Sequence, residues 1–198
     1  MICEISPEKI YLVMNKPSNY VCSSVSDSHK TVYDLLSLEL KNLLQAKRGE
    51  KIHTVGRLDC DTTGLLIFTT DGFFSNFITR NENKIPKTYL VELENSVSKI
   101  NQIFYKDKLR NGIILPAEKK SSEEFVDNAI INFLTETKCE VTITQGKFHQ
   151  IKRMFLALEN KVINLKRIAI GNLKLDENLN FGDYRILTKE EFYKIINF

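Results

Sequence analysis

The feature that most constrains the fold is an irregular succession of short apolar strands and amphipathic helices, with no repeating strand–helix–strand unit. Parallel sheets need such repeated units, whereas strands joined by turns favour antiparallel pairing. The order therefore predicts an α+β domain with a mixed, largely antiparallel sheet. Strands are expected at residues 10–15, 65–70, 88–93, 113–115, 125–134, 138–144 and 162–175.

Helical spacing of apolar residues predicts the helices. Residues 31–44 follow a possible N-cap at Thr31, and residues 188–196 follow another at Thr188, with acidic residues in the first turn. The other helices are expected at residues 73–79, 97–109 and 148–158.

The composition is that of an ordinary globular protein. With 198 residues, 42% of them hydrophobic, the chain can bury one substantial core or two small lobes that share one. It contains no internal repeat and no low-complexity linker, so residues 1–198 are expected to form a single domain. The net charge of +3 permits an RNA partner without requiring one.

The sequence disfavours a zinc-binding protein, a disulfide-bonded secreted protein and a membrane-spanning protein. The four cysteines form no C-x-x-C pair, and three histidines offer no recognisable zinc ligand set. We expect four reduced thiols in a cytoplasmic protein. No signal-peptide pattern is present, and no apolar stretch approaches the ~20 residues that a membrane span needs.

The most informative segment is GRLDCDTTGLL, residues 56–66, in which a polar turn lies between two apolar extended segments. Asp59 and Asp61 have three interpretations. The first is that their side chains bond backbone amides within a turn. The second is that they bind a divalent metal ion, which would require further carboxylates nearby. The third is that they supply a nucleophile or base while Arg57 positions the substrate.

A second segment, GKFHQIKRMF at residues 146–155, opens a helix with basic residues in its first turns. Its charged residues either form a solvated face or bind phosphate and supply a cation to a carboxylate. In a third segment, KTYLVEL at residues 87–93, Tyr89 is either a core aromatic or a ring that stacks on a base.

Together these segments resemble the bacterial pseudouridine synthase family, and within it the RsuA branch, which acts on the small ribosomal subunit. The resemblance extends to YLVMNKPSNYVCS at residues 11–23 and to GDYRILT at residues 182–188, and the matches follow the family's order. It implies two α/β lobes on a shared sheet, with a catalytic cleft between them. Only about nine residues precede the first expected strand, so the small N-terminal RNA-binding domain that usually accompanies this branch is expected to be absent, either naturally or through truncation.

The resemblance also implies roles for individual residues. Asp59 matches the essential carboxylate, and Lys152 matches the basic residue that pairs with that carboxylate. Arg57 matches the arginine that enters the RNA stack. Tyr89 matches the tyrosine that packs on the target base. Leu165 matches a pocket residue. RNA contacts are expected from Arg57, Lys147, His149, Gln150 and Arg153.

The expected reaction is the isomerisation of a uridine in ribosomal RNA without cofactor or metal. Small-subunit RNA, naked or in a partly assembled particle, is the expected substrate of a monomeric enzyme. The alternatives are a large-subunit RNA target, a non-catalytic RNA-binding assembly factor on the same scaffold, and a metal-dependent nuclease or phosphatase that uses Asp59 and Asp61.

Overall fold

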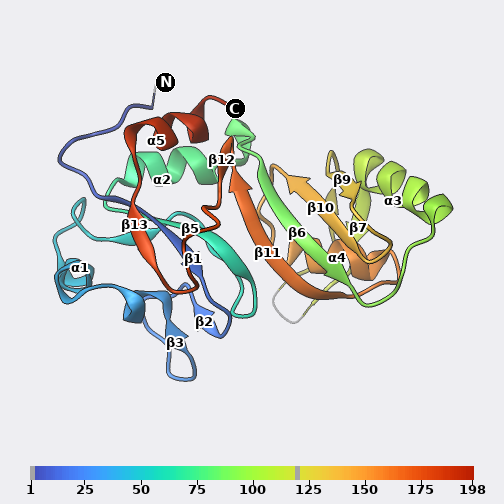
Figure 1. Cartoon of the computed structure of the whole chain (residues 1–198), viewed down its shortest axis with the longest axis horizontal. Coiled ribbons are helices and arrows are strands. Elements are labelled where there is room, and N and C mark those ends of the chain that lie inside the picture. The colour runs from blue at the N-terminus through green and yellow to red at the C-terminus, as the bar shows by residue number, and fades with distance from the viewer. Residues whose placement is uncertain (1–2, 119–120) are drawn as a thin grey trace. The chain divides into compact units, whose positions relative to one another are not determined.

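The computed structural model describes residues 3–118 and 121–198 (Figure 1). The chain forms two compact units. Unit 1 contains the chain up to Ile85 together with Arg167–Phe198, and unit 2 contains Pro86–Lys166. Unit 2 is therefore a continuous segment, whereas unit 1 is assembled from two separate segments.

Strand β1 (Tyr11–Lys16) lies in the middle of the unit 1 sheet, between β5 (Thr63–Thr69) and β13 (Tyr184–Ile186). It pairs antiparallel with both. All six residues of β1 are buried, which fits the continuous apolar run that predicted this strand. The short β4 (His53–Thr54) pairs antiparallel with β5.

Figure 1 shows helices α2 (Gly72–Thr79) and α5 (Lys189–Ile196) beside the strands of unit 1. Their side chains pack with those of β1 and β5 in the unit 1 core. Phe74 and Phe192 stack at a ring-centroid distance of 4.6 Å. Both helices were predicted, and α2 begins one residue earlier than expected. Asp71 caps α2, and Thr188 forms a capping box with Glu191 at the start of α5.

The sequence predicted a single helix at residues 31–44, and this prediction is wrong. The segment forms a 3-10 turn η1 (Val32–Leu35), the short α1 (Leu38–Asn42) and a second turn η2 (Leu43–Gln45). Leu36 is extended, and the Ser37 hydroxyl accepts the Leu40 amide, so that Ser37 caps a new helix. A serine that bonds nearby backbone competes with a continuous helix. Before this segment, β2 (Tyr20–Val21) pairs parallel with β3 (Lys30–Thr31).

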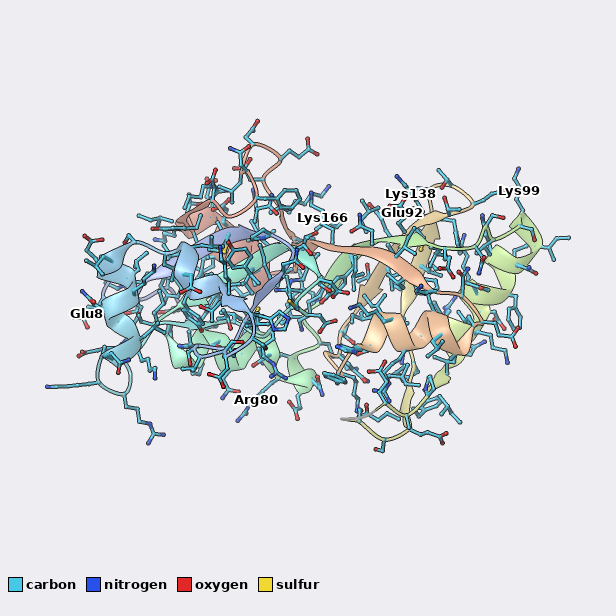
Figure 2. All side chains as sticks on the ribbon, turned by 90° about the horizontal axis from the view of Figure 1, so that it is seen from below. Glu8, Arg80, Glu92, Lys99, Lys138 and Lys166 are labelled. Atoms are coloured by element: carbon cyan, nitrogen blue, oxygen red, sulfur yellow. The ribbon has the colours of Figure 1, made fainter. Side chains whose placement is uncertain are left out.

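In unit 2, β10 (Lys138–Ile143) lies between β6 (Lys87–Leu93) and β9 (Ile130–Phe133), and both pairings are antiparallel. Lys138 and Glu92 face each other in the register and form an exposed ion pair at 3.6 Å (Figure 2). Helix α3 (Lys99–Asn111) contacts β9, and its Tyr105 hydroxyl donates to the Leu158 carbonyl just after α4 (Gln150–Ala157).

The strand predicted at residues 125–134 is divided. Its first part, β8 (Glu124–Val126), pairs with β7 (Ile113–Leu115), and its second part is β9. The break falls at Asn128, which adopts φ +55 and donates its amide to the Arg110 carbonyl. Asparagine tolerates this left-handed conformation, which ends a strand.

Strand β11 (Val162–Ile170) contains the boundary between the two units, and β12 (Leu173–Lys174) pairs antiparallel with its end. One further turn, η3 (Asn81–Asn83), follows α2. The predicted α+β class and the largely antiparallel pairing are confirmed. None of the described helices is long and apolar enough to cross a membrane.

Candidate active site

The segment that carries Asp59 lies between β4 and β5 in unit 1, and residues 57–62 are called the Asp59 loop below. Glycines with positive φ stand on either side of it, Gly56 at +68 and Gly64 at +99. A residue with a Cβ is strained in that conformation, so glycine suits both turning points. The loop is thus a short connection whose two ends are held by paired strands.

Inside the loop, some side chains are buried and others reach the surface. Leu58 and Thr62 are buried, whereas Arg57 and Asp61 are exposed. Asp59 is half-buried. A carboxylate at this depth can reach a ligand while the backbone around it stays packed, as a nucleophile or base requires.

Hydrogen bonds hold the loop to the segment that follows β1. The Leu58 amide donates to the Cys22 sulfur at 3.4 Å, and the Asn19 amide donates to the Cys60 carbonyl at 2.8 Å. Within the loop, the Thr62 amide donates to the Asp59 carbonyl at 3.1 Å. The backbone at Asp59 is therefore fixed on both sides of the residue.

Sequence reasoning missed Lys16, the last residue of β1. Its side chain is fully buried, and its ammonium donates to the carbonyl oxygens of Asp59, Cys60 and Thr62 at 3.0, 3.2 and 2.7 Å. It also donates to the Pro17 carbonyl at 3.0 Å. The signal was a lysine at the end of a buried strand that is apolar up to Met14, where a charged residue is rarely buried without partners.

Burial lowers the pKa of Lys16, while nearby Cys22, Cys60, Asp61 and Asp59 act to raise it. The same burial raises the pKa of the Cys22 thiol, although the Leu58 amide and neighbouring cations oppose the shift. Cys22 is therefore a buried thiol that accepts a hydrogen bond rather than a reactive thiolate.

Arg167 brings a second cation to this part of unit 1. It is 3% exposed, and its Nε donates to the Leu65 carbonyl of β5 at 2.7 Å. Its Nη2 is buried without a hydrogen-bond partner among the described residues. Both Lys16 and Arg167 act to lower the pKa of Cys22 against the larger effect of burial.

The basic segment in unit 2 leads into α4. His149, just before the helix, has φ +45, its ring stacks on that of Phe148, and its Nδ1 lies 2.8 Å from the Glu118 carboxylate. Lys147 forms an ion pair with Glu124 at 3.1 Å. Both residues remain partly exposed, as an RNA contact requires.

Arg153 and Gln150 do not lie where the expected RNA contacts would put them. Arg153 is 0% exposed, and its guanidinium donates to Glu124 and to the Pro116, Ser122 and Phe148 carbonyls. Gln150 is 5% exposed and accepts the Lys147 amide. A phosphate cannot reach the buried arginine, because its donors already hold the segment before β8.

The arginine also affects the charge of its partner. Hydrogen bonds from Arg153 and then from Lys147 lower the pKa of Glu124 below its usual value. Because both donors favour the ionised form, Glu124 stays negative across the neutral range.

Tyr89 lies on β6, opposite Val141 of β10, and is 9% exposed. Alternate residues of β6 are buried, so Lys87 lies on the same face as Tyr89. Lys152 lies in the first turn of α4 and is half-buried, and Leu165 on β11 is 7% exposed. No group of three or more His, Cys, Asp or Glu suited to a metal ion occurs among residues 3–118 and 121–198.

Comparison with known proteins gives a consistent result. The model of a family described as RNA pseudouridylate synthase matches residues 10–157. The chain is 38% identical over 186 residues to the ribosomal small subunit pseudouridine synthase A of Haemophilus influenzae, which covers 94% of this chain and 73% of that protein. The protein of the same name from Vibrio cholerae is 40% identical over 93% of this chain and 73% of its own length.

The solved structures agree. A crystal structure of a pseudouridylate synthase superposes with a TM-score of 0.82 at 39% identity, over 95% of this chain and 74% of that one. A Cbf5–Nop10–Gar1 complex superposes with a TM-score of 0.50 at 20% identity, over 86% of this chain and 52% of that one. The second likeness supports the fold alone.

Proposed function

Because the chain belongs to the RNA pseudouridylate synthase family, we propose that it isomerises a uridine of small-subunit ribosomal RNA to pseudouridine. The observation that carries the proposal is the 38% identity to a small-subunit enzyme over 94% of the chain, a span that includes the Asp59 loop. The reaction breaks the bond between the base nitrogen and the ribose, turns the base, and rejoins it through carbon 5.

Asp59 is the proposed catalytic carboxylate. The target atoms are hidden while the uridine is stacked, so the nucleotide must leave the stack at a cost of roughly a few kcal/mol. Arg57 is exposed beside Asp59, and its planar guanidinium suits the space that the base vacates. A flipped base excludes water and tends to raise the pKa of a carboxylate, which a nearby cation opposes.

Tyr89 and Lys152 are proposed to act on the same nucleotide. The tyrosine ring would pack on the base, and the lysine would supply a positive charge to the reacting nucleotide. Lys147 and His149 are partly exposed and would contact phosphates. Such contacts make RNA affinity fall as the salt concentration rises.

We propose that the partner is ribosomal RNA, either free or within a partly assembled ribosomal particle. We also propose that the enzyme is monomeric and cytoplasmic. We further propose that both units belong to one catalytic domain. The absence of redox and group transfer in the reaction explains why no cofactor is required.

The experiment is release of tritium from RNA that is labelled at carbon 5 of uridine, in the presence of EDTA. Small-subunit RNA, large-subunit RNA and partly assembled particles are offered in parallel. Wild type should release tritium from a small-subunit substrate, and Asp59→Asn should lose at least ~10³-fold in rate while it still binds RNA.

The matched control is Asp61→Asn, which removes the exposed carboxylate of the same loop. It should keep most of the rate, because this chemistry needs one carboxylate. No tritium release from wild type, together with RNA cleavage or phosphate release that requires a divalent cation when EDTA is left out, would favour metal-dependent hydrolysis. Release from large-subunit RNA alone would move the target to that subunit, and release from no substrate would favour a non-catalytic assembly factor.

A further inference from the structure

We propose that the turn at residues 47–51 binds phosphates of the RNA that flanks the target uridine, as a second RNA-binding surface outside the Asp59 loop. Residues 47–51 are called the basic turn below. The inference rests on the proposed function in one respect, which is that RNA is the partner. The contact itself can be measured by binding alone, without catalysis.

The basic turn has a fixed backbone. The Glu50 amide donates to the Lys47 carbonyl at 3.0 Å, which closes the turn. Gly49 adopts φ +93, a conformation in which a residue with a Cβ is strained, so glycine suits this position. The Lys9 ammonium donates to the Gly49 carbonyl at 2.6 Å and holds the turn to the segment before β1. The side chains of the turn therefore start from a defined backbone.

The cations of the basic turn have no acidic partner. Lys47, Arg48 and Lys51 are exposed, and no hydrogen bond or salt bridge joins their side chains to another group in the part of the chain that the structure describes. By contrast, the exposed Lys138 and Lys161 each pair with a glutamate. The three cations of the turn are therefore available to an external anion.

Positive charge is concentrated in this segment. Residues 41–53 carry four cations, which are Lys41 and the three of the basic turn, and a single acid, Glu50. This surplus of three positive charges equals the net charge of the whole chain. Like charges at close range repel one another in the free protein, and a bound phosphate relieves that repulsion. The basic turn thus attracts a polyanion on a chain whose other charges balance.

The basic turn leads directly into the strand that precedes the Asp59 loop. Ile52 is fully buried, and His53 begins β4, which pairs with β5. Arg57 follows Lys51 by six residues, so their Cα atoms lie at most about 20 Å apart. A nucleic-acid duplex carries one phosphate per ~1.7 Å of its axis, so about 20 Å of duplex presents roughly ten. RNA that brings a uridine to Asp59 therefore has phosphates within reach of the basic turn.

The chemistry of the basic turn fits phosphates rather than a protein surface. Residues 47–51 include no apolar side chain, whereas the centre of a protein interface is apolar and depleted of charge. Arg48 can bind two phosphate oxygens at once, and Lys47 and Lys51 add compact charges. Such contacts position RNA without reading its sequence. The turn should therefore raise the affinity for RNA and leave the choice of uridine to other contacts.

The first test measures the affinity for a transcript of small-subunit ribosomal RNA as a function of salt concentration. The test variant carries Lys47→Gln, Arg48→Gln and Lys51→Gln together, and it should fold because all three side chains are exposed. Three phosphate contacts contribute about 2–3 to the slope of log affinity against log salt. The variant should lose that part of the slope, and its dissociation constant at about 100 mM salt should rise at least ~10-fold.

The matched control removes three exposed cations from α3, by Lys99→Gln, Lys106→Gln and Lys108→Gln together (Figure 2 labels Lys99). It changes the net charge by the same amount at a different surface. Its slope should fall by less than about 1, and its dissociation constant should rise less than about 3-fold. Equal effects of the two triple variants would show that only net charge matters and would overturn the proposal.

The second test locates the contact. Lysine side chains are acetylated with an N-hydroxysuccinimide ester, with and without the same transcript, and the peptides are analysed by mass spectrometry. RNA should slow the acetylation of Lys47 and Lys51 at least ~3-fold, and this protection should disappear at high salt. Lys99 and Lys106 should react at unchanged rates. Unprotected Lys47 and Lys51 would overturn the proposal even if the affinities differ.

The outcomes separate this inference from the proposed function. A shallower slope together with local protection, in a protein whose wild type releases no tritium, would support the basic turn and reject uridine isomerisation. Tritium release by wild type, with equal salt slopes in wild type and the test variant, would reject the basic turn and support the proposed function. A wild type that does not bind the transcript would overturn the basic turn directly.

Discussion

The guanidinium of Arg153 donates to the carboxylate of Glu124 at 2.9 Å, and the arginine of this pair is fully buried while the glutamate is partly exposed. The remaining donors of the arginine bond carbonyls of the segment between β7 and β8 and of Phe148. A basic residue that the sequence suggested for RNA binding thus fixes local structure in unit 2.

Arg153→Met should destabilise the protein by roughly 2–4 kcal/mol, because it leaves several buried carbonyls without a donor. Thermal or urea unfolding measures the loss. Lys138→Met is the control, since it breaks only the exposed Lys138–Glu92 pair (Figure 2) and should change stability by less than about 1 kcal/mol. Equal effects of the two substitutions would contradict a structural role of Arg153.

Acid should destabilise unit 2 through Glu124. Its folded-state pKa is lowered from 4.5, so its stabilising effect is fully present above that value and disappears as the pH falls through the lower folded pKa. The melting temperature of wild type should therefore drop more steeply than that of Glu124→Gln between about pH 5 and about pH 3. Parallel curves would show that Glu124 does not contribute.

Gly171→Ala should be severely destabilising. Gly171 has φ +57, and an added Cβ would lie 2.4 Å from the backbone oxygen of Ile195 in α5. The conformational strain alone costs about 1–2 kcal/mol, and the backbone clash adds to it. Gly72→Ala is the matched comparison, because Gly72 is the first residue of α2 and has no atom within 4 Å of the added Cβ. It should be neutral or stabilise by up to about 1 kcal/mol in the same unfolding assay.

Cys60 should be the first cysteine to react with an alkylating reagent in the native protein. It is half-buried, whereas burial raises the pKa of Cys3 to about 11 and that of Cys139 to about 12. Peptide mapping after brief exposure to iodoacetamide identifies the labelled residue. Bound substrate RNA should slow the reaction, since Cys60 adjoins Asp59. Labelling of Cys139 before Cys60 would be inconsistent with the described packing.

Local patterns were sufficient to predict much of the fold. Apolar runs predicted β1 and β5, and the strand predicted at residues 88–93 is β6. The Thr188 cap predicted α5. These elements follow from neighbours in sequence, which is why periodicity and capping residues reveal them.

Other features depend on residues that are distant in sequence. The break at Leu36–Ser37 is accompanied by a bond from the Ser37 amide to the Tyr184 hydroxyl, and the break at Asn128 by a bond to Arg110. Lys16 donates hydrogen bonds to carbonyl oxygens that are far away in the sequence, and the Asp59 carbonyl is 43 residues further along the chain. The arginine, aspartate and threonine residues of the Asp59 loop made it recognisable in the sequence. No local pattern could predict that the Lys16 ammonium binds the carbonyl oxygens of this loop.

The division of unit 1 into two segments has a consequence for how the protein is made. Strand β1 forms three pairs with β13, among them Leu12 with Ile186, although unit 2 lies between them in the chain. During synthesis, the whole of unit 2 is made before the last strand and helix of unit 1. We expect unit 2 to fold first, while β1 and β5 wait for the C-terminal segment. The nascent chain is thus most exposed to misfolding and chaperone capture in the half that carries the Asp59 loop.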